Sequence, residues 1–325
     1  MIGGVLFILA GMFAYVRVDS AYAIVVVLIV AGIIAILVGL TGLRTQGWEI
    51  AVFAIGVIVF AAVLGSNYYY GQANSEVAQT YTATSGEINA SSIVVSAESS
   101  LGSIDIGFSS NSDMGYQVTF RIPSFIFPFF NVESGTPRLT NFTSGRVLYL
   151  NASSSAASIS ITIGERYAAI IHATTSTGSI DLKTPAGSVG NIRNISLSAD
   201  TGSVRASVDG GNVSSIKLST NTGSVNLQSN FLSPAGKHIP ILVSSNTGSA
   251  DVNISVANNV AVGINGSTAF GSILHDLPGF SVSENSNGRL VASAGNLSGA
   301  QRSFLVGASV NTGSLSIDCF LVSQE

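Results

Sequence analysis

The sequence has few of the residue types from which most catalytic, metal and nucleic-acid sites are built. It contains one cysteine and three histidines in 325 residues, and only 9% of its residues are charged. A single cysteine excludes an internal disulfide and a cysteine zinc cluster. Lys and Arg number 13 against 17 Asp and Glu, so the chain lacks a basic excess. We therefore expect no nucleic-acid partner.

Motifs for catalysis and cofactor binding are also missing. The histidines His172, His238 and His275 stand without the supporting neighbours that a nucleophile and base require. No Gly-rich phosphate loop, dinucleotide fingerprint or metal-spaced histidine pair occurs. We expect that the protein is not an enzyme and that it has no catalytic residue, no cofactor and no metal.

Residues 1–66 consist of apolar runs with only four charged side chains between them. The run at 21–43 has no charge and is long enough to cross about 30 Å of hydrocarbon, and the runs at 2–18 and 48–65 are near the lower limit. We predict three transmembrane helices and a lipid membrane partner. The alternative for the first run is a signal peptide cleaved near Ala21, although a positively charged n-region is absent.

The remaining residues are rich in Ser, Thr, Asn and Gly and poor in Lys. Residues 67–87 show no periodicity, which indicates a linker. The polar composition favours an extracytoplasmic C-terminal domain on a multi-pass membrane protein. Eight Asn-x-Ser/Thr sequons, slightly more than chance gives in so Ser/Thr-rich a region, are candidate glycosylation sites of a glycoprotein. They are Asn89, Asn141, Asn151, Asn194, Asn212, Asn253, Asn265 and Asn296.

One short sequence motif recurs through this region, most clearly as Asn-Thr-Gly-Ser-Val-Asn-Leu at 221–227. From Gly178 onward most copies are roughly 21 to 25 residues apart, a spacing typical of solenoids and other repeat folds. Weaker copies lie at Gly102, Gly271 and Gly288. The predicted turn glycines are Gly102, Gly178, Gly202, Gly223, Gly248, Gly271 and Gly313.

Apolar residues alternate with polar ones on both sides of each glycine. They fall two and four residues after it, and seven and often five residues before it. Each repeat is therefore two short strands of period two, joined at a glycine corner, with one face buried. We call such a unit a rung. Stacked rungs would bury a continuous core, so we predict a mainly β fold, a parallel β-solenoid over 88–325 with an irregular insertion at about 108–166. A β-sandwich is the alternative.

The same alternation places individual side chains. Asp181, Arg205, Asn226 and Asp251 should form an outward column three residues after the corner glycine, either as a plain polar ladder or as a calcium or glycan site. Cys319 should be a buried structural thiol.

The histidines fall at three different kinds of position. His172 should point outward, and His238 should lie in a Pro/Gly-rich connection. His275 falls on a core position and should mark a rung whose register has slipped.

The two ends of the predicted stack differ. Residues 122–130 contain two prolines and large apolar side chains, so they should form a loop that caps the stack or contacts a membrane or partner. Its contact residues are Phe125, Phe127, Phe129 and Phe130. At the C-terminus, Phe320, Leu321 and Val322 should form an open strand edge for assembly.

The repeated Thr-Gly-Ser-[Ile/Val]-x-[Leu/Val] phrase resembles the "putative adhesin" families of bacteria and archaea, whose similar repeats are expected to form β-solenoids. The resemblance covers about residues 88–325. The order of membrane helices and then such a domain is also similar to the toast-rack proteins associated with envelope stress, although those usually have Gly-Asp at the corner. Neither family offers catalytic residues.

The resemblance implies a membrane-anchored cell-surface protein with an adhesive or structural role in a bacterial or archaeal envelope. Its partners would be itself, another surface protein or a glycan. The alternative is an envelope-stress sensor that signals through its transmembrane helices.

Overall fold

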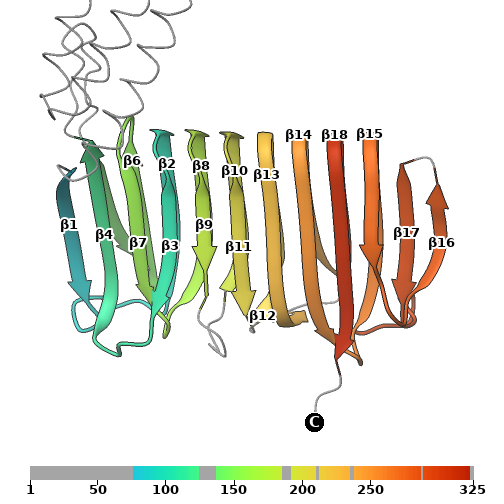
Figure 1. The fold of residues 1–325 in the computed structure, drawn as a ribbon. Helices are drawn as coiled ribbons and strands as arrows, with labels where there is room; N and C mark the ends of the chain where they lie inside the picture. The colour runs from blue at the N-terminus through green and yellow to red at the C-terminus, as the bar shows by residue number, and fades with distance from the viewer. Residues whose placement is uncertain are drawn as a thin grey trace, which may run out of the picture. The chain divides into compact units, whose positions relative to one another are not determined.

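The computed structural model describes residues 76–123, 137–184, 192–209, 212–234, 238–286 and 288–322. Every regular element in these residues is a β-strand, so the prediction of a mainly β fold is confirmed (Figure 1). Within them, no helix is long and apolar enough to cross a membrane. The transmembrane helices predicted in 1–66 and the contact residues Phe125, Phe127, Phe129 and Phe130 lie outside the described residues.

In the part of the chain that the structure describes, eighteen strands make up one sheet. Their bounds are β1 Glu76–Thr84, β2 Ser92–Leu101, β3 Ile104–Ser109, β4 Met114–Pro123, β5 Arg138–Ser144, β6 Val147–Ser154, β7 Ser158–Gly164, β8 Ala168–Thr177, β9 Ile180–Lys183, β10 Ile192–Thr201, β11 Val204–Asp209, β12 Asn212–Val213, β13 Ser215–Pro234, β14 His238–Ala257, β15 Ala261–Asp276, β16 Ser281–Ser286, β17 Arg289–Ala294 and β18 Ser303–Val322.

The rungs pair in parallel and in register through both of their halves. β2 and β3 form one rung, as do β6 and β7, β8 and β9, and β10 and β11, whereas β13, β14, β18 and β15 each run continuously through the corner. The corner glycines align directly, as Gly223 with Gly248 and Gly248 with Gly313. The sheet therefore bends at a line of glycines into a curled half-barrel with the core inside the bend.

Alternation of side chains explains why these residues form this core. The residue seven before each corner glycine points inward and is buried, as at Val95, Ile171, Ile195, Ile216, Ile241 and Val306. The intervening side chains are exposed or half-buried, as the burial pattern of β14 shows on both sides of the corner. Because each rung buries its apolar face mainly against its neighbours, the repeat can be stable only as a stack.

The corner requires glycine for two separate reasons. Gly223 has a φ of 140°, which side chains rarely adopt, and a Cβ there would lie 2.0 Å from the carbonyl oxygen of Gly202 on the neighbouring rung. All seven predicted turn glycines lie at such corners with positive φ. The weaker copy at Gly288 also has a positive φ, but it precedes β17 and is not the corner of a parallel rung.

Buried hydroxyl groups support the corners from inside. The side chains of Thr175, Thr220 and Ser245, three residues before their glycines, donate to the carbonyl oxygens of Gly102, Gly202 and Gly223 at 3.0 to 3.1 Å. Each bond joins one rung to the next at the bend, where a buried polar group needs a partner. This row was not among the predicted features, although Ser or Thr at this position is visible in most repeats.

The order of rungs in space differs from their order in the chain. Along the stack they follow as β6/β7, β2/β3, β8/β9, β10/β11, β13, β14, β18 and β15 (Figure 1). The C-terminal strand β18 thus lies between β14 and β15. This corrects the expectation that the C-terminal strand ends the stack. Phe320, Leu321 and Val322 pair on one side with Ser255, Val256 and Ala257, and β15 pairs with β18 only as far as Asp318.

Two further expectations change at the other end of the stack. The predicted irregular insertion at 108–166 contains a regular rung, β6/β7, which pairs in parallel with β2 and β3. The predicted linker 67–87 includes strand β1, which pairs with β4.

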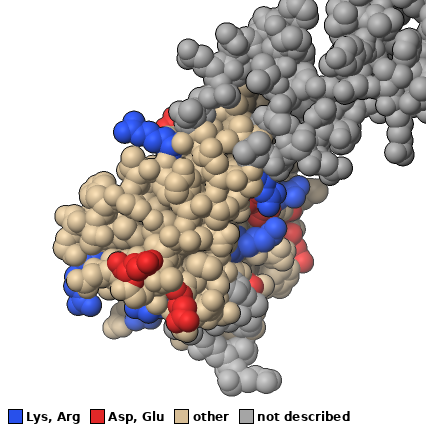
Figure 2. Space-filling view, turned by 90° about the vertical axis from the view of Figure 1, so that its left-hand side faces the viewer, with Lys and Arg blue, Asp and Glu red and all other residues tan. Residues whose placement is uncertain are grey.

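Antiparallel strands flank the parallel rungs at both ends of the stack. β5 pairs with β6, and β4 pairs with β7. At the opposite end, β17 pairs with the first half of β15, and β16 pairs with β17. Figure 2 looks onto the end formed by β1 and its neighbours, where charged side chains of both signs are scattered over a mostly uncharged face.

Candidate binding groove on the rung corners

A shallow groove of about 680 Å³ runs along the outer side of the first half-strands, just before the corners. It crosses five rungs, from β10 through β13, β14 and β18 to β15. Apart from Ala199, Ala269 and Val310, the side chains that line it are Ser, Thr, Asn and Asp. The groove is therefore a surface of hydrogen-bonding groups rather than an apolar pocket.

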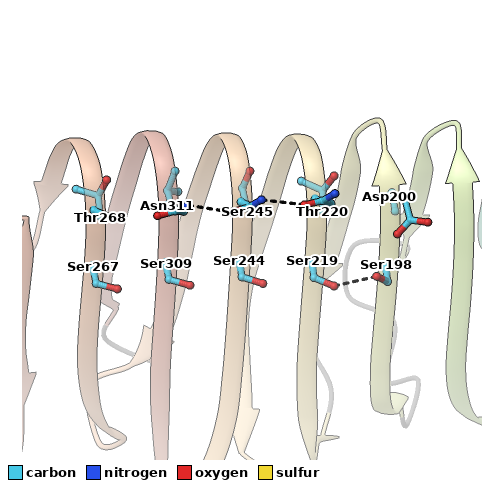
Figure 3. Close-up of a pocket in the computed structure, with 15 residues that line it drawn as sticks. Ser198, Asp200, Ser219, Thr220, Ser244, Ser245, Ser267, Thr268, Ser309 and Asn311 are labelled. Atoms are coloured by element: carbon cyan, nitrogen blue, oxygen red, sulfur yellow. Dashed lines mark hydrogen bonds between the residues drawn. The ribbon is translucent and has the colours of Figure 1, made fainter.

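Two rows of side chains define the groove (Figure 3). The first row lies four residues before each corner glycine and consists of Ser198, Ser219, Ser244, Ser309 and Ser267. The second lies two residues before and consists of Asp200, Asn221, Asn246 and Asn311. Both rows follow from the parallel register, which repeats each side chain at the rung spacing of about 4.8 Å.

Hydrogen bonds between rungs fix the orientation of these side chains. Asn311 Nδ2 donates to Asn246 Oδ1 at 3.1 Å, and Asn246 Nδ2 donates to Asn221 Oδ1 at 2.9 Å. Ser219 Oγ donates to Ser198 Oγ at 3.0 Å. A partner that binds here meets donors and acceptors that are already ordered, so less side-chain entropy is lost on binding. These rows were not among the residues predicted to form a site.

The outward column predicted from the sequence lies on the second half-strands. Register places Asp181 beside Arg205, Arg205 beside Asn226 and Asn226 beside Asp251, as expected. The ion pair of Asp181 is nevertheless with Lys183, at 3.3 Å, and not with Arg205. Asn226 Nδ2 donates to Asp251 Oδ2 at 3.1 Å, so this part of the column is a polar ladder.

Carboxylates crowd together in this column and its neighbours. Partial burial and the adjacent Asp181 raise the pKa of Asp105, against the lowering effect of Arg121 and Lys183. Partial burial and then Asp318 raise the pKa of Asp251. Within the described residues, however, no group of three or more His, Cys, Asp or Glu side chains could hold a metal ion.

Each histidine has a different environment. His172 is exposed on the outer face of β8, as predicted. His238 begins β14 rather than lying in a connection, and its Nδ1 is 2.7 Å from Ser303 Oγ. His275 pairs in register with Ile317, so its register has not slipped. Its side chain is half-buried, and its Nε2 lies 3.0 Å from Asn285 Nδ2 on β16.

Cys319 lies on the core alternation of β18, 1% exposed, as the sequence predicted. Burial raises the pKa of its thiol to about 12. The thiol therefore stays protonated and is a poor nucleophile.

The candidate glycosylation sites differ in accessibility. Asn89, Asn141, Asn151, Asn265 and Asn296 are exposed, whereas Asn194 and Asn253 are half-buried within strands. The side chain of Asn212 lies outside the described residues.

No protein-family model matches this sequence, and no curated protein matches it either. Among solved structures, a "putative cell adhesion protein" from Clostridium sporogenes is similar over 75% of this chain and 100% of its own, with 12% identity and a TM-score of 0.46. A "putative adhesin" from Bacteroides fragilis covers 76% of this chain and 98% of its own, with 10% identity and a TM-score of 0.22. A "putative adhesin" from Parabacteroides distasonis covers 75% and 98%, with 7% identity and a TM-score of 0.23.

Proposed function

We propose that this protein is a membrane-anchored cell-surface protein with an adhesive or structural role, and that its β-solenoid contacts glycan chains through the corner groove. The observation that carries the proposal is the two in-register polar rows, the serine row across five rungs and the Asp/Asn row across four of them. A glycan chain also presents hydroxyl groups at regular intervals, and the Ser hydroxyls and Asn amides of the groove can donate to them and accept from them.

Energetics favour an extended ligand over a small one. A single hydrogen bond exchanged with water contributes only about 0.5–1.5 kcal/mol, so one rung cannot hold a ligand. Five aligned rungs can sum several such contacts, and stacked repeats generally use long surfaces of this kind for binding. The groove lacks aromatic side chains, which predicts modest affinity for one chain and stronger binding to arrayed glycans through multivalency.

The membrane anchor and the location outside the cell are inferred from the sequence. The apolar runs in 1–66 supply the membrane anchor, and the polar, lysine-poor remainder suits an exposure outside the cell. Protease added to intact cells should therefore remove residues beyond about 75. Digestion only after lysis would contradict the surface location.

Binding can be tested with the full chain in mild detergent on an array of envelope polysaccharides. Ser244→Arg places a long side chain in the middle of the groove and should abolish binding to any polysaccharide that the native chain retains. Ser96→Arg is the matched control, because Ser96 is exposed on the same side of the sheet on β2, outside the groove. Equal loss in both variants, or no loss in either, would contradict the assignment of the groove.

A further inference from the structure

Two aromatic side chains stack on the outer face of the hairpin formed by β5 and β6. Phe142 and Tyr149 are opposite each other in the pairing of these strands. Their rings are parallel to within 6°, with centroids 4.8 Å apart. Phe142 is 53% exposed and Tyr149 is half-buried. The pair therefore leaves aromatic surface in contact with solvent, where the apolar face of a ligand can pack.

One of the eight candidate glycosylation sites lies beside these rings. Asn151 follows Tyr149 by two residues on β6, so both side chains project from the same face, about 7 Å apart along the strand. None of the other seven sequons has an aromatic residue two positions before its asparagine. The neighbours of Asn151 on the adjacent strands, Thr140 and Ser96, have small side chains. They leave room for a sugar next to the rings.

The sequon at Asn141 lies on the same hairpin but on its other face. Asn141 pairs with the buried Leu150, and its Nδ2 donates to the hydroxyl of Tyr116. Within the described residues, the side chain of the exposed Asn151 makes no hydrogen bond. Attachment of a sugar replaces a hydrogen of the amide nitrogen. Modification of Asn141 would therefore disturb an existing contact, whereas modification of Asn151 would not.

We propose that Asn151 carries an N-linked glycan whose first sugar packs its apolar face against Tyr149 and Phe142. The donor is an oligosaccharide joined through C1 to the phosphate of a lipid carrier. Asn151 Nδ2 forms a bond to C1 while the bond from C1 to the phosphate oxygen breaks. The lipid phosphate leaves, and the amide gives up one proton. The sequon specifies this occupant, because covalent attachment holds the sugar beside the rings at a high effective concentration that a free sugar lacks.

The inference goes beyond the proposed function. It rests on the proposed location of this domain outside the cell, since N-glycans are found on surface proteins, and it does not depend on the groove. β2 and β8 lie between β6 and β10, the first strand of the groove, so the glycan leaves the groove accessible. Its effect is to cover aromatic surface at one end of the stack, where exposed apolar groups favour association.

The first experiment is mass spectrometry of tryptic peptides from the full chain, purified from its native membranes. Trypsin cuts after Arg146, so the peptides 139–146 and 147–166 separate the two asparagines of the hairpin. We expect a sugar mass on Asn151 and none on Asn141. An unmodified Asn151, or equal modification of both asparagines, would overturn the proposal. If added protease removes the domain from intact cells but Asn151 is unmodified, the surface location stands and only the glycan fails.

The second experiment tests the contact with the rings by a double-mutant cycle on the glycosylated full chain. Asn151→Gln and Ser153→Ala each remove the sequon, and each should lower the melting temperature by roughly 1–6 °C, the shift that one aromatic contact gives. In the Tyr149→Leu background both should leave it unchanged. Asn265→Gln is the matched control, because Asn265 is exposed in the same row on β15 but follows Gly263 by two residues, so its effect should not depend on Tyr149. Equal shifts for Asn151→Gln in both backgrounds would overturn the contact between the sugar and the rings.

Discussion

Because the rungs approach closely at the corner, we predict that glycine substitutions destabilise the fold by different amounts at different positions. In Gly223→Ala the new Cβ would lie 2.0 Å from the carbonyl oxygen of Gly202, whereas an ordinary contact begins at 3.4 Å. The rungs would have to separate by more than 1 Å locally, which breaks ladder bonds such as Gly202 N to Thr222 O, 2.8 Å in the native stack.

The magnitude combines two effects. Backbone strain at positive φ costs about 1–3 kcal/mol, and each ladder bond lost adds about 1 kcal/mol. We therefore expect Gly223→Ala to lower the free energy of unfolding by about 3–5 kcal/mol, or the melting temperature by roughly 6–20 °C for a domain of this size. Hydrogen exchange should rise first in the rungs next to Gly223, because repeat stability depends on nearest neighbours.

Substitutions at two control glycines separate the effect of a positive φ on stability from the effect of close approach between rungs. Gly145 has a φ of 61° but open space where its Cβ would be, so Gly145→Ala should cost only about 1 kcal/mol. Gly107 has open space and no left-handed φ, so Gly107→Ala should change stability by less than about 0.5 kcal/mol. Thermal melts followed by circular dichroism measure which of the three substitutions is the most destabilising and which the least. If Gly223→Ala and Gly145→Ala are equally destabilising, close approach is not what selects glycine at the corner.

Two other substitutions test the buried hydroxyls and the crowded carboxylates. Thr220→Val keeps the side-chain volume but removes the donor to the Gly202 carbonyl, so it should cost about 1–2 kcal/mol in the same melts, and an unchanged melting temperature would contradict the bond's role. The raised pKa of Asp105 means that the folded state holds this proton more tightly than the unfolded state, so its contribution is present below pH 3.8 and is lost as pH rises through the folded pKa. Asp105→Asn should therefore raise the melting temperature slightly at neutral pH and leave it unchanged near pH 3, and a lower melting temperature at neutral pH would contradict this.

Much of the fold could be predicted from the sequence because it depends on local patterns. The phrase around Gly223 contains both the corner and the phase of the strands on either side, so the alternation by itself assigns Val204, Val225 and Val252 to the core. Cys319 could be placed inside for the same reason. The polar rows of the groove were also present as Ser and Asn at fixed distances before the glycine. Nothing in their chemistry set them apart from ordinary solvated side chains.

Only the tertiary structure decided which rung stacks on which. Parallel rungs of this kind offer one another the same main-chain donors and acceptors, so the ladder bonds do not distinguish β18 beside β14 from β15 beside β14. The order depends on how connections and antiparallel strands cover the ends, which is a property of the whole stack. Hence the sequence indicated that the C-terminal strand ends the stack, whereas the structure places β18 between β14 and β15.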